Sequence, residues 1–410
     1  MRFLRRPSQP FLNTTIISKM SFGVYIHVPF CRSKCPYCDF YSVLIRDKEI
    51  KEKYTDAAVK EIRSFKRYFR DDAEHAFIKQ EPDSIYFGGG TPSLLEPIRI
   101  KEMIKACDDT FGREDDREVT LEANPGTVDA DSLKGFKAMG VNRLSIGVQS
   151  FDDQILKKLG RTHKTEDSLK AFEEARLAGF ENISIDLIFG IEGQTMESWE
   201  DSLKKALELD PEHISLYSLE FMEGTVFTRM LMEGRMKETD PEEDRQMYER
   251  AVEVLTEAGY VHYEISNFAK PGYESRHNLK YWDLDDYAGF GPGAHSYMTD
   301  DETGYGQRFY HAGDLEGYLR DPLSVTFMEP NGYADDMQEF TITALRRSSG
   351  ISKSEFEERF GQDFWGFYGD LARLQFKSFV DTGHAAEDED NIRLTLKGFN
   401  VSNQILSLFV

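Results

Sequence analysis

The chain has 410 residues, which is long for one ordinary compact domain and suits several domains or one large α/β barrel with an appendage. Hydrophobic residues make up 40% of the chain and charged residues 30%, a composition that excludes a disordered protein. No run approaches about eighteen consecutive apolar residues, which excludes a transmembrane helix. The net charge of −23 argues against nucleic acid as a partner, because neutralising phosphates requires a basic surface.

The N-terminal segment, residues 1–20, is predicted to be a basic extension. It contains three arginines and Lys19 and no acidic residue. Such a leader is typical of a mitochondrial presequence. The alternative is that Met20 is the natural start and residues 1–19 are an upstream extension. We therefore expect a cytoplasmic protein, or a mitochondrial one if residues 1–19 are a presequence.

Six short runs rich in β-branched and aromatic residues follow, each succeeded by a helical pattern such as 47–70 or 195–208. Strands that alternate with helices indicate a parallel sheet with right-handed crossovers. We predict an α/β fold, a partial TIM-like (β/α)6 barrel over 21–235, with its site at the carboxyl ends of the strands. The predicted strands are 23–30, 83–89, 118–124, 143–150, 182–190 and 213–221.

Local signals mark the ends of several predicted helices. Thr195 is a predicted N-cap for the helix 195–208. Gly140, Gly179 and Gly259 each stand between a helical pattern and the next β-rich run. Glycine at this position adopts the left-handed conformation that closes a helix.

The pattern changes beyond residue 235. We expect 236–330 to be a connecting region whose stretch 260–325, rich in Tyr, Gly and His, is irregular. Three short helices within 331–379 and a strand at 391–396 predict a C-terminal winged-helix-like domain over 331–410. DNA binding by that domain is disfavoured, because it contains 8 basic and 13 acidic residues.

The cysteines indicate a reducing compartment with one cluster reserved for chemistry. Cys31, Cys35 and Cys38 form a C-x3-C-x2-C motif directly after the first predicted strand, and Cys107 stands alone. Three thiolates on one loop can hold three irons of a 4Fe–4S cluster, leaving the fourth iron open to a small molecule. The alternative is structural zinc, which needs four ligands. Cys107 lies far along the chain on a predicted helix, and His27 lies within a strand.

This motif, with an aromatic Tyr37 before the last cysteine, resembles the radical S-adenosylmethionine (SAM) superfamily. Four further motifs, Tyr25–Cys31, Gly88–Pro92, Gly147–Ser150 and Asp186–Gly190, resemble the oxygen-independent coproporphyrinogen oxidase group within it. The resemblance implies that the open iron chelates SAM and that an electron from the cluster cleaves it to a 5′-deoxyadenosyl radical. The SAM contacts that it implies are Tyr25, Tyr37, Gly89, Gly90, Thr91, Glu122, Gln149, Arg161 and Asp186.

The sequence departs from the oxidase at one position. The oxidase carries a further cysteine two residues after the third, where this chain has Phe40. The segment His277-Asn-Leu-Lys-Tyr281-Trp282 matches the H-N-x-x-Y-W motif of the sister group, the HemW family of heme chaperones. A histidine beside large aromatic side chains suits heme, because imidazole binds the iron and aromatic faces cover the macrocycle. The alternative is that His277 hydrogen-bonds a turn while Tyr281 and Trp282 fill a core.

His295, in a G-x-G-x-G-A-H segment, is a second candidate for the heme contact. We expect a heme chaperone that carries a 4Fe–4S cluster and SAM and transfers heme to a membrane-bound or respiratory acceptor. The alternatives are the oxygen-independent coproporphyrinogen III oxidase, which Phe40 disfavours, and a radical enzyme with an unrelated substrate. Such a chaperone could form a homodimer through its cluster loop, although no sequence pattern indicates one.

Overall fold

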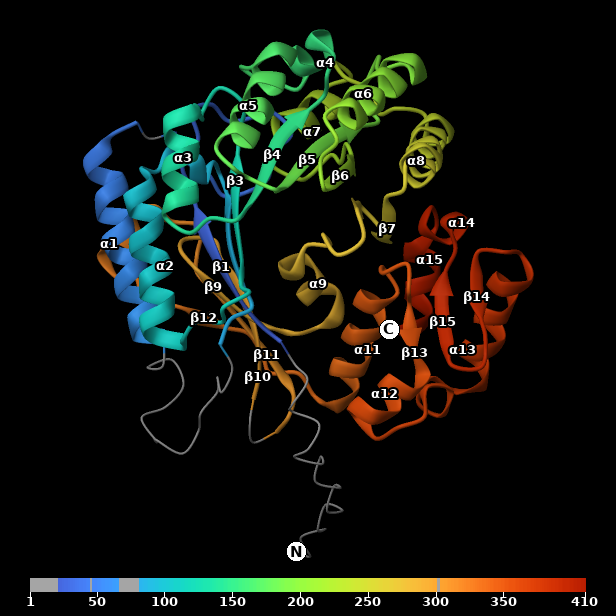
Figure 1. The fold of residues 1–410 in the computed structure, drawn as a ribbon. Coiled ribbons are helices and arrows are strands. Elements are labelled where there is room, and N and C mark those ends of the chain that lie inside the picture. Colours follow the sequence, from blue (N-terminus) through green and yellow to red (C-terminus); the bar gives the residue numbers. More distant parts are fainter. Residues whose placement is uncertain (1–20, 45, 66–80, 301–302) are drawn as a thin grey trace, which may run out of the picture.

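The computed structural model describes residues 21–44, 46–65, 81–300 and 303–410 (Figure 1). The predicted basic extension and the end of the predicted helix 47–70 lie outside these residues. Within them, one curved sheet of twelve strands runs in the order β12-β11-β10-β9-β1-β2-β3-β4-β5-β6-β8-β7.

The six predicted strands form the parallel centre of this sheet, which confirms the partial barrel. Other parts of the chain cover both faces of this parallel part of the sheet, so its strands are almost continuously buried. The strands are β1 (Phe22–Val28), β2 (Ser84–Gly89), β3 (Glu118–Ala123), β4 (Arg143–Gln149), β5 (Asn182–Phe189) and β6 (His213–Ser218).

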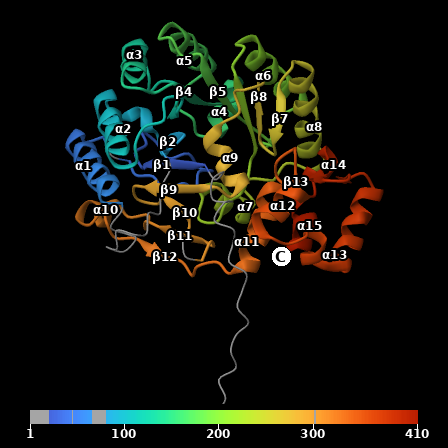
Figure 2. The ribbon, with the colours of Figure 1, turned by 60° about the horizontal axis from the view of Figure 1, so that its bottom comes forward.

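Helices cover the convex face of the barrel and pack on one another in chain order (Figures 1 and 2). Their buried stripes close the core; Trp199 of α6, for example, is fully buried and donates to the Met247 carbonyl at 2.9 Å. The main layer comprises α1 (Lys48–Ser64), α2 (Pro97–Phe111), α3 (Ala130–Ala138), α5 (Thr165–Leu177), α6 (Met196–Glu208) and α8 (Pro241–Glu257). Shorter helices are the 3-10 turn η3 (Pro92–Leu94), α4 (Asp153–Lys158) and α7 (Val226–Met232).

The predicted helix ends are confirmed. Gly140, Gly179 and Gly259 have φ of 106°, 91° and 91°. In each case the following residue donates back to the helix, as Val141 does to the Phe136 carbonyl at 3.1 Å. Thr195 caps α6, because its hydroxyl accepts from the Ser198 amide at 3.2 Å.

The stretch expected to be irregular, 260–325, instead extends the sheet at both edges. The added strands, the last of which lies just beyond this stretch at Thr326–Phe327, are only two to five residues long, and glycines stand between several of them, so no alternating pattern marks them in the sequence. On one side β7 (Val261–Glu264) and β8 (Asn267–Ala269) follow β6; on the other β9 (Asp286–Phe290), β10 (His295–Thr299), β11 (Gly306–Tyr310) and β12 (Thr326–Phe327) follow β1.

Helix α9 (Arg276–Asp283) carries the H-N-x-x-Y-W motif inside the curve of the sheet, where it contacts β1, β2 and α11 (Figure 1). Helix α10 (Leu315–Arg320) packs on α1 at the outer edge.

The C-terminal region combines helices with a small antiparallel sheet of order β13-β15-β14, as the winged-helix-like prediction requires. Its core is aromatic and includes the buried rings of Phe356, Phe364 and Phe376. The elements are α11 (Tyr333–Ala344), β13 (Ile351–Ser352), α12 (Lys353–Phe360), α13 (Phe364–Asp381), β14 (Ala385–Glu387), β15 (Asn391–Leu394), α14 (Leu396–Phe399), α15 (Ser402–Leu406) and the 3-10 turn η4 (Ser407–Phe409).

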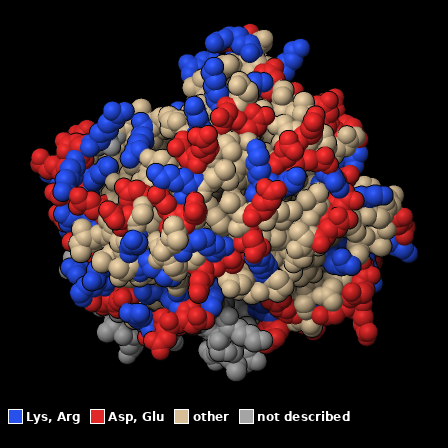
Figure 3. All heavy atoms as spheres, turned by 45° about the horizontal axis from the view of Figure 1, so that its top comes forward, with Lys and Arg blue, Asp and Glu red and all other residues tan. Residues whose placement is uncertain are grey.

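The charges on the surface are mixed where one face of the molecule can be seen. On the face in Figure 3, lysine and arginine are interspersed with aspartate and glutamate. Among the described residues, no helix is both long enough and apolar enough to cross a bilayer.

Candidate functional site

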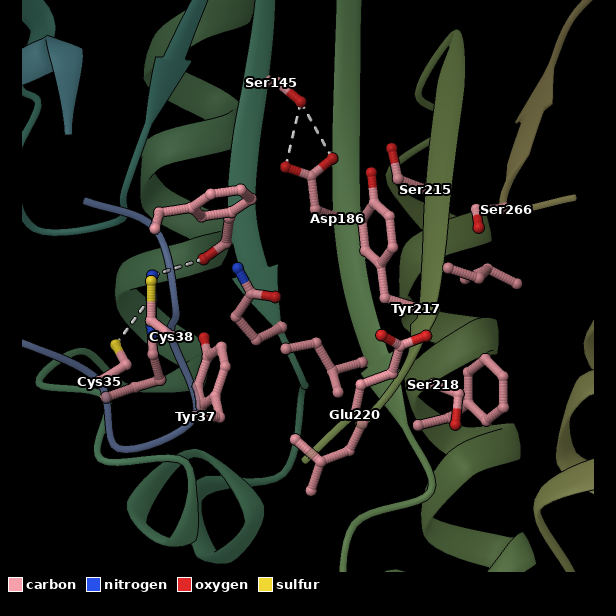
Figure 4. Close-up of a pocket in the computed structure, with 18 of the residues that line it drawn as sticks. Cys35, Tyr37, Cys38, Ser145, Asp186, Ser215, Tyr217, Ser218, Glu220 and Ser266 are labelled. Atoms are coloured by element: carbon pink, nitrogen blue, oxygen red, sulfur yellow. Dashed lines mark hydrogen bonds between the residues drawn. The ribbon is translucent and has the colours of Figure 1, made fainter. Parts of the chain in front are cut away.

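A cavity of about 1410 Å³ opens at the carboxyl ends of the parallel strands (Figure 4). It is lined by all three clustered cysteines and by every predicted SAM contact except Tyr25. Parallel strands bring their carboxyl ends to one edge, and the predicted residues follow different strands, so the barrel brings them together. Residues that follow β6, residues of α8 and residues of the C-terminal domain also line the cavity, among them Glu220, Asp244 and Asn400.

The loop that carries the cysteines is fixed at its base and in its middle. The Cys31 amide donates to the Val43 carbonyl at 3.0 Å, and the Val43 amide donates to the Pro29 carbonyl at 2.7 Å. The Phe227 amide at the start of α7 donates to the Pro36 carbonyl at 2.9 Å. These bonds close residues 31–42 into a defined loop over the cavity.

Two of the three thiols have polar neighbours that can stabilise anionic sulfur, whereas burial favours the neutral thiol. Cys31 Sγ lies 3.7 Å from the Thr91 hydroxyl, and the Arg161 guanidinium lies 3.5 Å from Cys35 Sγ. Burial raises the pKa of the Cys31 thiol and raises that of Cys38 to about 11. Metal ligation deprotonates such thiols, because the thiolate is the form that binds.

The donor set fits a cluster better than a single zinc ion. Among the described residues, no group of three or more Cys, His, Asp and Glu side chains is arranged to hold one metal ion. Both ring nitrogens of His27 are engaged, Nε2 with the Tyr41 carbonyl at 2.8 Å and Nδ1 with the Tyr25 hydroxyl at 3.0 Å. Cys107 is fully buried in α2. A zinc site would lack its fourth ligand, whereas a 4Fe–4S cluster takes one thiolate for each of three irons.

Gly89 and Gly90 at the end of β2, which together form the glycine lip, separate the cysteine loop from β3. Gly89 has φ of 103°, and a Cβ at Gly90 would lie 2.8 Å from the Phe30 carbonyl oxygen, so a larger residue would push the cysteine loop away. The next residue, Thr91, is buried, and its hydroxyl accepts from the side-chain amide of Asn124 at 3.0 Å. The backbone of β2 therefore approaches the cavity as the sequence predicts.

Arg161 joins three strand ends. Besides Cys35 it donates to the Gly147 carbonyl at 3.0 Å and to the Asn124 side-chain oxygen. Asn124 was not predicted as a site residue, although its place directly after β3 was a signal. Arg161 thus faces sulfur and neutral oxygens rather than the acidic partner of an ordinary surface arginine.

Two carboxylates stand side by side in the cavity wall. The Tyr86 hydroxyl donates to Glu122 at 2.9 Å, and the Ser145 hydroxyl lies 3.0 Å from both oxygens of Asp186 (Figure 4). Burial and the neighbouring Asp186 raise the pKa of Glu122 to about 7, and burial raises that of Asp186. Sequence reasoning missed Tyr86 and Ser145, because single hydroxyls inside strands carry no motif. The pair suits a bound cation or the hydroxyls of a sugar.

Tyr37 and Gln149 complete the wall. The Tyr37 ring lies 6.2 Å from that of Phe227, which fixes it on the cysteine loop. Gln149 ends β4 with φ of 67°, a left-handed conformation that non-glycine residues rarely adopt. Such strained positions concentrate at ligand sites.

Gly160 offers a test of the loop's support. It has φ of 69°, and an added Cβ would lie 2.6 Å from Pro36 in the cysteine loop, whereas at Gly179 the same atom would meet open space. Alanine costs about 1–2 kcal/mol of backbone strain at either site. We expect Gly160→Ala, but not Gly179→Ala, to lower the iron bound after anaerobic reconstitution by about twofold or more. Equal iron contents in the two variants would contradict this placement.

The predicted heme residues do not line one common cavity, although His277 and Tyr281 contact each other. His277 is buried, with Nδ1 3.0 Å from the Ser84 hydroxyl and Nε2 3.0 Å from the Tyr281 hydroxyl. Trp282 faces the Arg346 guanidinium at 5.7 Å and lines neither the main cavity nor a smaller second cavity beside it. The reason is that α9 lies inside the barrel, which turns His277 to the polar sheet face and Trp282 to the C-terminal domain. Tyr281 alone of the three reaches a cavity.

That second cavity, of about 500 Å³, lies beside the main one. It also contains Tyr25, which the sequence analysis placed among the SAM contacts, and His295, the second heme candidate. Asp39 and Phe40 line both cavities.

Three thiols on the loop after the first strand of an open parallel barrel, facing a cavity with a glycine lip, are the arrangement of the radical SAM class. Residues 25–206 match the Radical SAM superfamily, and residues 334–401 match the HemN C-terminal domain. The chain is 36% identical to the heme chaperone HemW of Bacillus subtilis, over 95% of this chain and 99% of that protein. The chain belongs to the HemW family of the radical SAM superfamily.

Two further comparisons agree. Radical S-adenosyl methionine domain-containing protein 1, mitochondrial, of Mus musculus is 33% identical over 94% of this chain and 86% of its own length. The structure of coproporphyrinogen III oxidase (HemN) from Escherichia coli superposes with a TM-score of 0.79, covering 95% of this chain and 90% of that one. Its sequence identity is 23%, so it supports the fold alone.

Proposed function

We propose that this protein is a heme chaperone, which binds heme and transfers it to an acceptor protein. The observation that carries this proposal is its similarity to HemW relatives over almost the whole of both chains. The preferred location is the cytoplasm. A mitochondrial location is the alternative, which relatives named as mitochondrial support and which depends on residues 1–19.

We further propose that the main cavity holds a 4Fe–4S cluster and SAM. Cys31, Cys35 and Cys38 would bind three irons, and the open iron would bind the amino and carboxylate groups of SAM. When bound, these groups supply one-electron cleavage of the SAM sulfonium. The chain itself would position SAM: the backbone of the glycine lip can approach it closely, and Glu122 and Asp186 offer acceptors for an ammonium or for ribose hydroxyls.

Phe40 disfavours the coproporphyrinogen oxidase alternative. Its side chain is 62% exposed at the rim shared by the two cavities. A hydrocarbon ring there provides no sulfur ligand where the oxidase has its additional cysteine. The chaperone's acceptor, by the same proposal, is a membrane-bound or respiratory heme protein.

Two parallel assays separate the two functions. Reconstituted protein, SAM and a low-potential reductant are incubated anaerobically with coproporphyrinogen III, while a second sample is titrated with hemin. We expect no protoporphyrinogen and a saturable Soret band at one heme per chain. Stoichiometric, SAM-dependent decarboxylation would establish the oxidase instead, and absence of saturable heme binding would refute the chaperone.

A further inference from the structure

The second cavity is predominantly aromatic. Five tyrosines and Phe40 contribute to its lining, together with His27, His295 and His311. Its volume of about 500 Å³ falls within the range of small-molecule sites. Flat rings on several sides suit a flat conjugated ligand, because aromatic faces stack on one another.

The three histidines of this cavity differ in whether a ring nitrogen is free. Both nitrogens of His27 are engaged by Tyr41 and Tyr25, as described above. His311 is buried, with Nε2 2.6 Å from the carboxylate of Glu61. His295 is exposed, and within the described part of the chain neither of its ring nitrogens has a hydrogen-bond partner.

His295 is nevertheless held in place. It begins β10, and its ring stacks on that of Tyr310 with centroids 5.2 Å apart. Partial burial and the nearby Arg308 lower its pKa, so the imidazole is neutral near pH 7. A neutral imidazole with a free nitrogen is the form that binds a metal.

Two glycines hold Tyr41 in the lining of this cavity. A Cβ at Gly293 would lie 3.0 Å from the Tyr41 side chain, and one at Gly313 would lie 2.9 Å from its ring. Tyr41 is therefore clamped between two glycine turns, and its hydroxyl accepts from the Leu315 amide at 2.7 Å. A tyrosine held in this way and a free imidazole therefore line the same cavity.

We propose that the second cavity is the heme site, with His295 as the axial ligand of the iron and the rings of Tyr310, Tyr41 and Phe40 against the porphyrin. This inference rests on the proposed chaperone function and moves the ligand from His277, whose ring nitrogens are both occupied. It also gives Phe40 a role, since that ring lies at the border between the heme and the cluster loop.

The test is a hemin titration of the reconstituted protein, with His295→Ala and the control His384→Ala. His384 lies in the C-terminal domain, where Nδ1 is 3.0 Å from the Thr382 hydroxyl. We expect His295→Ala to weaken heme binding at least about tenfold and to change the Soret spectrum, whereas His384→Ala behaves as wild type. Added imidazole should restore the wild-type spectrum of His295→Ala, an outcome that a purely structural role does not give.

The outcomes separate this inference from the chaperone proposal. If wild type binds heme saturably and His295→Ala binds it with the same affinity and spectrum, the site assignment is wrong and the chaperone proposal stands. If wild type binds no heme, both are wrong. Loss of binding in His295→Ala without imidazole rescue also contradicts the assignment of an axial ligand.

Discussion

Cys38→Ser removes the broad iron–sulfur absorbance that wild type gains on anaerobic reconstitution. Serine offers no thiolate. Cys31 and Cys35 are then the only cysteines left in the loop, so one iron loses its protein ligand. We expect iron and labile sulfide to fall to a small fraction of wild type. Absorbance and iron and sulfide assays measure the effect.

Cys107→Ser is the matched control, because it makes the same chemical change far from the loop. Cys107 is fully buried in α2, so serine there costs stability, by about 1–3 kcal/mol, but leaves the cluster ligands intact. We expect Cys107→Ser to reconstitute normally once folded. Zinc without labile sulfide in reconstituted wild type would show that the cluster assignment is wrong.

Glu122→Gln is expected to stabilise the ligand-free protein at pH 8 while weakening its affinity for SAM. The pKa of Glu122 is raised from 4.5 to about 7, so the folded state holds a proton that the unfolded state releases between these values. Stability therefore falls as pH rises through this window, and the penalty is complete above about pH 7. Glutamine removes the penalty, worth about 1–3 kcal/mol at pH 8 and close to nothing at pH 4.5.

Apparent melting temperatures at pH 5 and pH 8, with SAM titration by calorimetry, measure these opposed effects. The exposed Glu114→Gln is the control, and we expect it to change neither quantity. Equal destabilisation of Glu122→Gln at both pH values would mean that Glu122 is not a strained carboxylate. Unchanged SAM affinity would remove Glu122 from the proposed contacts.

Much of the barrel could be predicted because its signals are local. Buried parallel strands are short continuous apolar runs, and the glycines that close helices stand directly before them, as Gly140 does before β4. Strands β7–β12 could not be predicted in this way. They are short, and pairing across the sheet, rather than their own pattern, determines that they are strands.

In the candidate site, too, some residues could be predicted from the sequence and others could not. Motif residues at strand ends, such as Thr91 and Arg161, converge because the topology of a parallel barrel requires it. The H-N-x-x-Y-W motif did not indicate in which direction its side chains point. Its helix lies inside the barrel, so His277 is committed to hydrogen bonds within the fold, and the accessible imidazole is that of His295. Side-chain direction in a connecting region depends on packing that the sequence pattern does not encode.

The central claim, that this chain delivers heme, is tested most directly by a transfer measurement. Heme-loaded protein is mixed with a heme-free respiratory oxidase in membrane vesicles, and the oxidase spectrum is followed against free hemin at the same total concentration. The chaperone account predicts that the oxidase acquires its heme spectrum faster from the loaded protein while the Soret band of the protein declines. Heme that stays on the protein, or that reaches the oxidase no faster than free hemin does, would contradict it.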